Sequence, residues 1–212
     1  MLQDTPDIQV VDRRSRILDA AERCFVRAGF HRTTMQDVAA EAGMSPGNLY
    51  RYFPSKDAIV VGLTERDRSD VAKDFALFDS GDDFMTAFAK LGRKHFAEEP
   101  REKAIMCLEI WAESARNPAF AAVCAEFEQF IIARLTEVLQ QARERGEVPA
   151  DVDPEAVARI ISTLADGLFV RRAIAPGFDA AREVPNVIAV IGALLSGAAP
   201  LTCPANVSEA SS

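Results

Sequence analysis

Apolar residues recur along most of the chain at the three- and four-residue spacing of one helix face, not with the alternation of a strand. The first such stretch begins at Arg13 and ends at Gly29, a residue that readily adopts the left-handed conformation that closes helices. Its apolar face consists of Ile17, Leu18, Ala21, Phe25 and Ala28. Residues 1–12 show no such period, so we expect a loose arm there.

Two short helices follow this first one. Thr34 and Asp37 have the spacing of a capping box at the start of a helix that reaches Ala42. After Gly43, Ser45 can cap a third helix whose first turn contains Pro46. Two helices joined by so short a turn predict a helix-turn-helix over about residues 34–53.

The rest of the chain also predicts helices, separated by proline and glycine. We expect them at about 56–78, 82–98, 101–116, 118–145, 154–174 and 184–197. No segment combines alternation with enrichment in β-branched residues, so the predicted fold class is all-α. The predicted organisation is a helix-turn-helix domain at 11–71, a second helical domain at 72–198, and a disordered tail at 199–212.

The segment GMSPGNLYRYFPSK (43–56) places small residues before a group of polar and basic ones. Small side chains allow the start of a recognition helix to approach base edges in the major groove, where amide side chains can read them. Tyrosine hydroxyls and basic groups can reach phosphates. Leu49 and Phe53 are spaced to pack inward against Phe25 and Val38. The candidate DNA-contacting residues are Thr34, Ser45, Pro46, Gly47, Asn48, Tyr50, Arg51, Tyr52 and Lys56.

The charge distribution allows such a contact only in a small region. The chain of 212 residues has a net charge of −8. Residues 1–56 hold eight Lys and Arg against seven Asp and Glu, whereas the remainder is strongly acidic. An acidic body repels DNA, so any DNA contact must come from the first 56 residues. Arg13, Arg14 and Arg16 could reach the DNA backbone or form an exposed basic face.

The same composition argues against several other classes of protein. We find no transmembrane run, no signal peptide and no metal-ligand spacing, and only two histidines. Phosphate loops and the G-x-S-x-G motif of hydrolases are missing, so we expect neither an enzyme nor a metal or cofactor. The four cysteines are expected to be reduced cytoplasmic thiols, although one could sense redox state.

The run RILDAAERCFVRAGFHRTTMQDVAAEAGMSPGNLYRYFPSKDAI resembles the N-terminal domain of TetR-family transcriptional regulators, over about residues 13–60. The later segment from Gly146 to Leu168 is similar to the connection into the penultimate helix of many members. The resemblance implies a homodimer that binds a palindromic operator, usually as a repressor, and is released by a small effector. It also implies that Thr34 contacts phosphate, that 45–52 read the DNA and that Lys56 contacts its backbone.

For the second domain, the resemblance implies that the last two helices pair with their copies in a four-helix bundle. The alternative is that they are internal core helices of a monomer. The expected interface residues are Ile160, Ile161, Leu164, Leu168, Ile188, Ile191 and Leu195.

An effector pocket is expected near the segment 104–113, which is apolar on nearly every side. Large aromatic side chains with Met and Cys suit an apolar or aromatic ligand, although ordinary core packing explains each residue as well. Glu109 is the exception, and it could pair with a cation of the protein or face a cationic ligand. The candidate pocket residues are Phe84, Phe88, Met106, Cys107, Glu109, Ile110, Trp111, Phe127 and Phe130.

One rival function remains, a helical protein-interaction adaptor without DNA binding. The sequence does not decide between repression and activation, nor does it name the effector or the operator.

Overall fold

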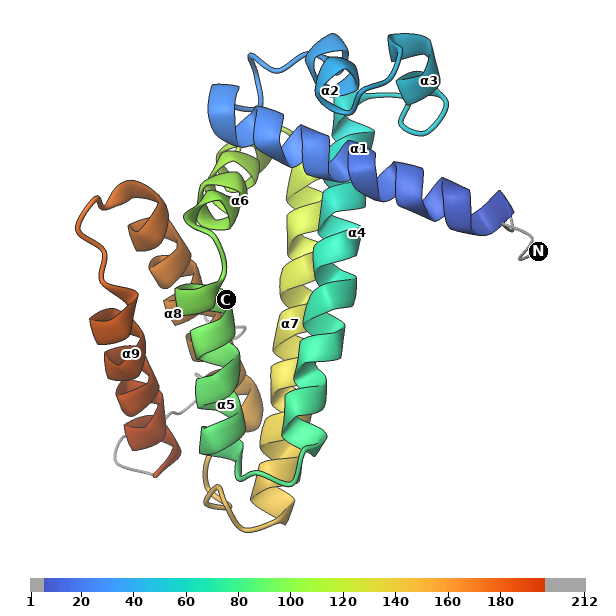
Figure 1. The fold of residues 1–212 in the computed structure, drawn as a ribbon. Coiled ribbons are helices and arrows are strands. Elements are labelled where there is room, and N and C mark those ends of the chain that lie inside the picture. Colours follow the sequence, from blue (N-terminus) through green and yellow to red (C-terminus); the bar gives the residue numbers. More distant parts are fainter. Residues whose placement is uncertain (1–5, 197–212) are drawn as a thin grey trace, which may run out of the picture. The chain divides into compact units, whose positions relative to one another are not determined.

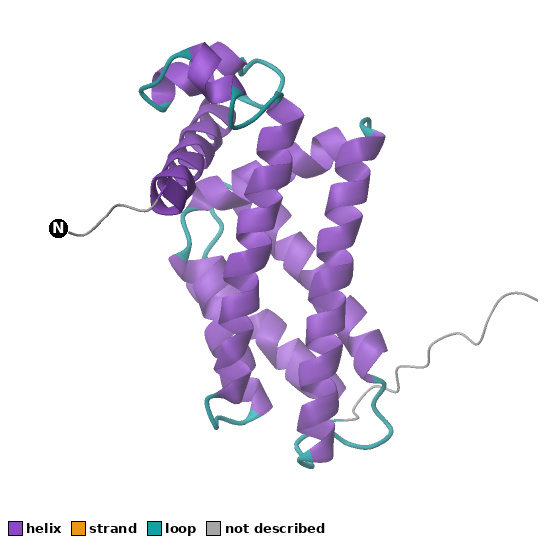
Figure 2. Ribbon diagram, turned by 90° about the vertical axis from the view of Figure 1, so that its right-hand side faces the viewer, coloured by secondary structure: helices purple, strands orange, loops and turns teal. Residues whose placement is uncertain are grey.

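The computed structural model describes residues 6–196 as helices joined by loops, and no strand occurs within that range (Figures 1 and 2). The predicted all-α class is therefore confirmed for the described residues. The α-helices are α1 (Pro6–Ala28), α2 (Met35–Glu41), α3 (Pro46–Tyr50), α4 (Lys56–Asp74), α5 (Phe84–Arg93), α6 (Arg101–Ser114), α7 (Pro118–Glu144), α8 (Pro154–Ile174) and α9 (Ala180–Leu195). A 3₁₀ helix, η1 (Phe75–Asp79), follows α4, and a π-helix, η2 (Lys94–Glu98), follows α5.

Two helix starts differ from the sequence prediction. α1 begins at Pro6, so at least residues 6–12 of the expected loose arm are helical. α9 begins at Ala180, one turn before the expected start, because Asp179 caps it and Pro185 lies inside the helix. The predicted tail at 199–212 lies outside the described residues.

The described chain divides into two compact units. The first comprises the chain up to Asp70 together with Arg101–Glu126, and the second comprises Val71–Pro100 and the chain from Phe127 onward. The sequence prediction placed 101–126 in the second domain. Packing assigns this segment to the first unit, because Met106 of α6 and Phe120 of α7 are buried in the same core as α1.

Each unit has its own apolar core. In the first, Phe25, Val38, Leu49 and Phe53 are almost fully buried in one cluster, as the helix-turn-helix prediction requires. In the second, a row of phenylalanines from η1 and α5 packs with α7, α8 and α9. Burial of this much apolar surface provides the main driving force for folding. No helix in the described part of the chain is long and apolar enough to cross a bilayer.

Candidate nucleic-acid interface and neighbouring sites

Residues 45–52, called here the reading segment, contain the short helix α3, whose start is capped by a side chain. The Ser45 hydroxyl accepts a hydrogen bond from the Asn48 amide at 3.3 Å, and Pro46 occupies the first turn. Leu49 and Phe53 point into the core and anchor the segment. The cap and the anchors fix which side chains face outward.

The outward face carries the residues that the sequence singled out. Tyr50 is 50% exposed, Arg51 is exposed, and Asn48 and Tyr52 are partly exposed. A Cβ atom placed on Gly47 would meet no atom within 4 Å, so the protein's own packing does not require glycine there. The result is a small surface of amide, hydroxyl and guanidinium groups on a rigid support, which suits DNA contacts.

Thr34 caps α2 in the predicted capping box. Its hydroxyl accepts from the Asp37 amide at 3.1 Å, and its own amide donates to the Asp37 carboxylate at 2.8 Å. Hydrogen bonds from Thr34 hold the pKa of Asp37 below its usual value. The box fixes the N-terminal end of α2, the first helix of the helix-turn-helix pair.

Lys56 faces the protein as well as solvent. Its ammonium donates to the carbonyl of Phe30 at 2.5 Å and to that of Thr33 at 2.9 Å, and it lies 4.2 Å from the centre of the Phe30 ring. Burial lowers the pKa of Lys56. In this conformation the ammonium stabilises the turn between α1 and α2, a role that the sequence did not indicate.

The arginines of α1 attach it to the helix-turn-helix. Arg13 approaches the Tyr52 hydroxyl at 3.4 Å, and the Arg14 guanidinium lies 4.5 Å from the centre of the Phe53 ring. Arg16 donates to the carbonyl of Ala42, at the end of α2, at 3.2 Å. The sequence left these arginines open between DNA contact and an exposed basic face, and the structure shows that each also contacts the helix-turn-helix.

The predicted pocket residues divide by burial. Phe84, Phe88 and Met106 are no more than 7% exposed, and the Phe84 and Phe88 rings stack at 5.7 Å, so these three are core residues. All nine stay predicted pocket residues, and the other six are only partly buried: Cys107, Glu109, Ile110, Trp111, Phe127 and Phe130. The Glu109 carboxylate accepts a hydrogen bond from the Phe30 amide at 3.0 Å.

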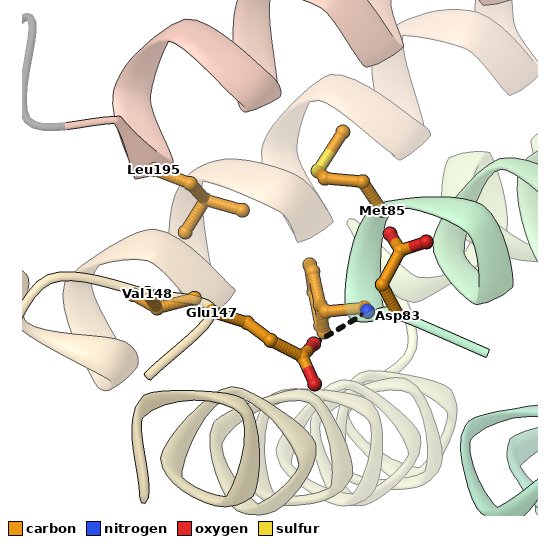
Figure 3. A pocket seen from close by; sticks show the side chains of 6 residues that line it. Asp83, Met85, Glu147, Val148 and Leu195 are labelled. Atoms are coloured by element: carbon orange, nitrogen blue, oxygen red, sulfur yellow. Dashed lines mark hydrogen bonds between the residues drawn. The ribbon is translucent and has the colours of Figure 1, made fainter. Parts of the chain in front are cut away.

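A small cavity of about 180 Å³ lies elsewhere in the second unit (Figure 3). Glu147 beside it accepts a hydrogen bond from the Phe84 amide at 2.7 Å and so caps α5. The cavity shares only Phe84 with the predicted pocket, and it is smaller than typical ligand sites of 300–1,000 Å³. It is lined by Asp83, Phe84, Met85, Glu147, Val148 and Leu195.

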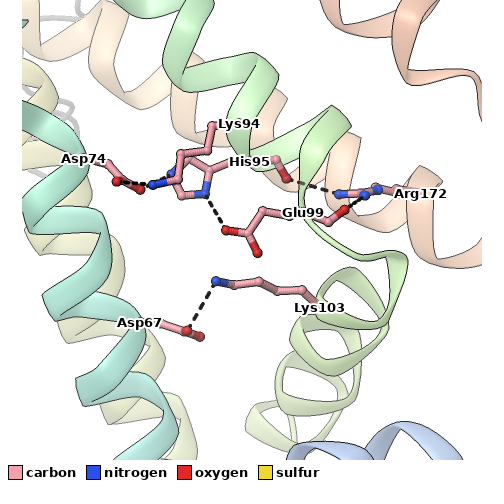
Figure 4. A network of polar contacts seen from close by, with 7 residues as sticks. All are labelled: Asp67, Asp74, Lys94, His95, Glu99, Lys103 and Arg172. Carbon is pink, nitrogen blue, oxygen red and sulfur yellow. Dashed lines mark hydrogen bonds and ion pairs between the residues drawn. The ribbon is translucent and has the colours of Figure 1, made fainter. Parts of the chain in front are cut away.

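A polar network in the second unit was not foreseen from the sequence (Figure 4). The nearly buried Asp74 carboxylate pairs with Lys94 and lies 3.1 Å from Nε2 of His95. Arg172 of α8, also buried, donates to the carbonyls of His95 and Glu99. These bonds satisfy carbonyls at the irregular π-helix, whose local geometry gives no clear sequence signal.

A separate ion pair in the first unit links α4 to α6. Lys103 lies 3.4 Å from Asp67, and burial raises the pKa of that carboxyl (Figure 4). A partly desolvated pair of this kind fixes the position of α6 more than it stabilises the fold.

The predicted dimer residues differ in their burial within the single chain. Ile161, Leu168, Ile191 and Leu195 are no more than 5% exposed, and they offer little surface to a second copy. The interface stays a prediction. Spacing alone did not show which side of the broad apolar faces turns inward. Ile160, Leu164 and Ile188 are partly exposed. The outer faces of α8 and α9 instead present Ile174 at 61% and Val190 at 54% exposure.

Comparison with known proteins gives matches over most of the chain. Residues 17–63 match the family described as bacterial regulatory proteins, tetR family, and residues 93–196 match the BetI-type transcriptional repressor C-terminal family. The HTH-type transcriptional regulator UidR of Escherichia coli K12 is 27% identical over 198 residues, which cover 92% of this chain and 99% of UidR.

Two solved structures have similar folds. Salmonella enterica GusR superposes with a TM-score of 0.75 at 28% identity, covering 92% of this chain and 100% of GusR. The SmeT–triclosan complex gives a TM-score of 0.75 at 22% identity, covering 93% of this chain and 100% of SmeT. At that identity the second likeness shows the fold alone.

Proposed function

Because this chain belongs to the TetR family of bacterial regulatory proteins, we propose that it is a homodimeric repressor that a small effector releases from a palindromic operator. Its relatives' names describe transcriptional regulators and repressors of the helix-turn-helix type. The dimer, the effector and the cytoplasmic location are parts of the proposal.

The reading segment is the observation that supports the proposal most strongly. Its anchors are buried, whereas Tyr50 and Arg51 are exposed on a capped helix. Gly47 leaves open space that the fold does not need. We assign base-edge contacts to the start of α3 and phosphate contacts to the tyrosines, Arg51 and Thr34. Lys56 has one N–H beyond those that bond the carbonyls of Phe30 and Thr33, so it can add a phosphate contact through that donor.

Two reading segments are needed for a palindrome, because half-sites recur about one DNA turn apart. We place the contact between copies on the outer faces of α8 and α9, with Ile174 and Val190 at its centre. Gly167 supports this placement, because it lies exposed within α8 and a Cβ atom there would meet nothing within 4 Å. Glycine within a helix costs about 0.5–1 kcal/mol relative to alanine. A helix of the second copy that packs closely against α8 would explain why glycine is present at position 167.

The effector is proposed to be apolar or aromatic. Trp111 is the single tryptophan of the chain, and it is partly buried on α6. Its fluorescence is therefore a direct reporter of ligand binding near that helix. A series of apolar and cationic compounds that leaves the Trp111 emission and the DNA affinity unchanged would contradict this assignment.

The function is tested by titrating the protein into labelled DNA from upstream of its own gene, beside a scrambled duplex, at several salt concentrations. Each lost phosphate contact reduces the slope of log K against log salt by about 0.9. We expect Arg51→Ala to reduce that slope and Asn48→Ala to weaken only the specific duplex. An adaptor without DNA binding would bind neither duplex, nor genomic fragments, at low salt. Transcription of the adjacent gene in a deletion strain then distinguishes repression from activation.

A further inference from the structure

The turn between α1 and α2, residues 29–33, is held by side chains from other helices more than by its own sequence. Gly29 has a φ of +81°, and Thr33 closes the turn with a hydrogen bond from its hydroxyl to the Gly29 carbonyl at 2.9 Å. The Phe30 ring is buried against Phe25 and Phe120. The Lys56 ammonium donates hydrogen bonds to the carbonyls of Phe30 and Thr33. The turn leads directly into Thr34, the cap of α2.

Two carboxylates of α6 complete this arrangement. The Phe30 amide, which has no helical partner in the turn, donates to Oε2 of Glu109 at 3.0 Å. One turn further along α6, Oε2 of Glu113 lies 2.7 Å from Nε2 of His31, although the geometry is not that of a hydrogen bond. The Glu113 side chain is only 11% exposed. Residues four apart on a helix share a face, so both carboxylates point at the same turn.

α6 combines a match to the C-terminal family with direct contacts to this turn. It lies within residues 93–196, which match the C-terminal family, yet its side chains pack with α1 in the first unit. Removing Glu109 from the turn would leave the Phe30 amide without its acceptor. Removing Glu113 from His31 would take away the polar group that faces its buried Oε2 atom, which accepts no hydrogen bond. Leaving a buried polar group without a partner costs more free energy than a typical hydrogen bond contributes to stability. A movement of α6 relative to the turn would therefore break the contacts of Glu109 with Phe30 and of Glu113 with His31.

We infer that Glu109 and Glu113 are positioning residues for DNA binding: from α6 they hold the 29–33 turn, and with it α2 and the reading segment, in the arrangement that binds the operator. This inference rests on the proposed function, since it concerns the same interface. It assigns Glu109 to the protein's own backbone, not to a cationic ligand.

The test compares operator binding of the full-length protein with that of Glu109→Ala, Glu109→Gln and Glu113→Ala. Glu102→Ala is the matched control, because Glu102 is exposed on the first turn of the same helix. We expect Glu109→Ala to weaken binding by about 5- to 20-fold, the effect of one lost charged hydrogen bond. Glu113→Ala should weaken binding by a smaller factor, because Glu113 makes no hydrogen bond to His31, whose side chain is 68% exposed. The Gln amide oxygen can still accept from Phe30, so Glu109→Gln should stay within about threefold of wild type.

The salt dependence separates a positioning role from a direct one. Neither carboxylate touches phosphate in this proposal, so the slope of log K against log salt should stay at the wild-type value in every variant. Operator affinities of Glu109→Ala and Glu113→Ala equal to that of Glu102→Ala would overturn the inference. A changed slope would also overturn it, because phosphate contacts would then be the cause.

Hydrogen exchange of the Phe30 amide provides a readout without DNA. We expect slow exchange in wild type and in Glu102→Ala, and fast exchange in Glu109→Ala, with the rest of α1 still protected. Fast exchange of the Phe30 amide in wild type would refute the proposal that Glu109 holds the turn. This result needs no variant, so it stands even if the variants do not fold. If wild type binds no DNA but exchanges slowly at Phe30, the proposed function fails while the hold by α6 stands.

Discussion

Two charged side chains, Glu109 and Lys56, hold the turn between α1 and α2. Glu109 lies between Leu108 and Ile110 and invited a ligand role, yet it accepts a hydrogen bond from a turn 79 positions away in the sequence. Lys56 follows the reading segment and suggested DNA contact, yet its ammonium holds two carbonyls of that same turn. Both roles depend on partners that only folding brings near, so no spacing along the chain could reveal them.

The double role of Lys56 leads to a prediction for Lys56→Met, which keeps most of the aliphatic stem. Loss of the ammonium leaves the carbonyls of Phe30 and Thr33 without their donor. We expect a loss of stability of about 1–2 kcal/mol in urea unfolding. If Lys56 also contacts phosphate when DNA binds, the salt slope of operator binding falls by about 0.9 as well. Unchanged stability would show that the carbonyl contacts contribute nothing.

Asp166 of α8 gives a prediction for pH. Desolvation and then the Glu128 carboxylate raise the pKa of Asp166 from 3.8 to about 6. The folded state therefore binds this proton more tightly than the unfolded chain does, so stability should increase as the pH falls from 7 through 6 towards 4. The Asp166 side chain as a whole is exposed, although neighbouring groups partly desolvate its carboxylate. Solvent screening therefore limits the effect, and Asp166→Asn should be more stable than wild type at pH 7.5 by about 1 kcal/mol.

The measurement for Asp166 is urea unfolding at pH 5 and 7.5. The variant should lose the wild-type gain in stability on acidification over that interval. Asp153→Asn serves as the control because Asn also caps helices, so the pH dependence should remain. A wild-type protein that becomes less stable between pH 7.5 and 5 would argue against the raised pKa.

At the scale of elements, caps and breakers were the most dependable signals. Thr34 and Ser45 cap helices where the sequence predicted caps, and Gly29, Gly43 and Gly146 have the positive φ that ends a helix. Asp153, which the sequence analysis did not single out, caps α8. Pro185 is the exception, since it lies within α9 instead of starting it. Its ring removes an amide donor, so the Ala181 carbonyl lacks its usual helical partner.

The position of Pro185 predicts that Pro185→Ala stabilises the protein. The new amide could bond the Ala181 carbonyl within an existing helix, and alanine is the best helix former. We expect a gain of about 1 kcal/mol in unfolding free energy, below the full interior cost of proline because the site lies near the helix start. Equal or lower stability of the variant would mean that proline is already accommodated at no cost.

At the scale of the whole molecule, the proposed dimer depends on side chains that face out of α8 and α9. Ile174→Glu combined with Val190→Glu should convert the dimer to a monomer, because two charges per copy would be buried without partners. Sedimentation equilibrium measures the state directly, and circular dichroism confirms folding. Ile191→Ala is the contrasting variant: it should lower stability by about 2–4 kcal/mol through a core cavity and leave the association state alone. A double variant that remains dimeric would place the interface elsewhere.

The sequence by itself determined the helical class, the helix-turn-helix, its inward anchors Leu49 and Phe53, and the family, because these depend on local period, caps and a dense motif. Tertiary structure alone decided which faces of α8 and α9 turn inward and that α6 packs within the first unit. It also decided what Glu109, Lys56 and Arg172 contact. The reason is physical. A helix period states that one side is apolar, but the partner of that side, and of any charge beside it, is chosen by contacts between segments far apart in the chain.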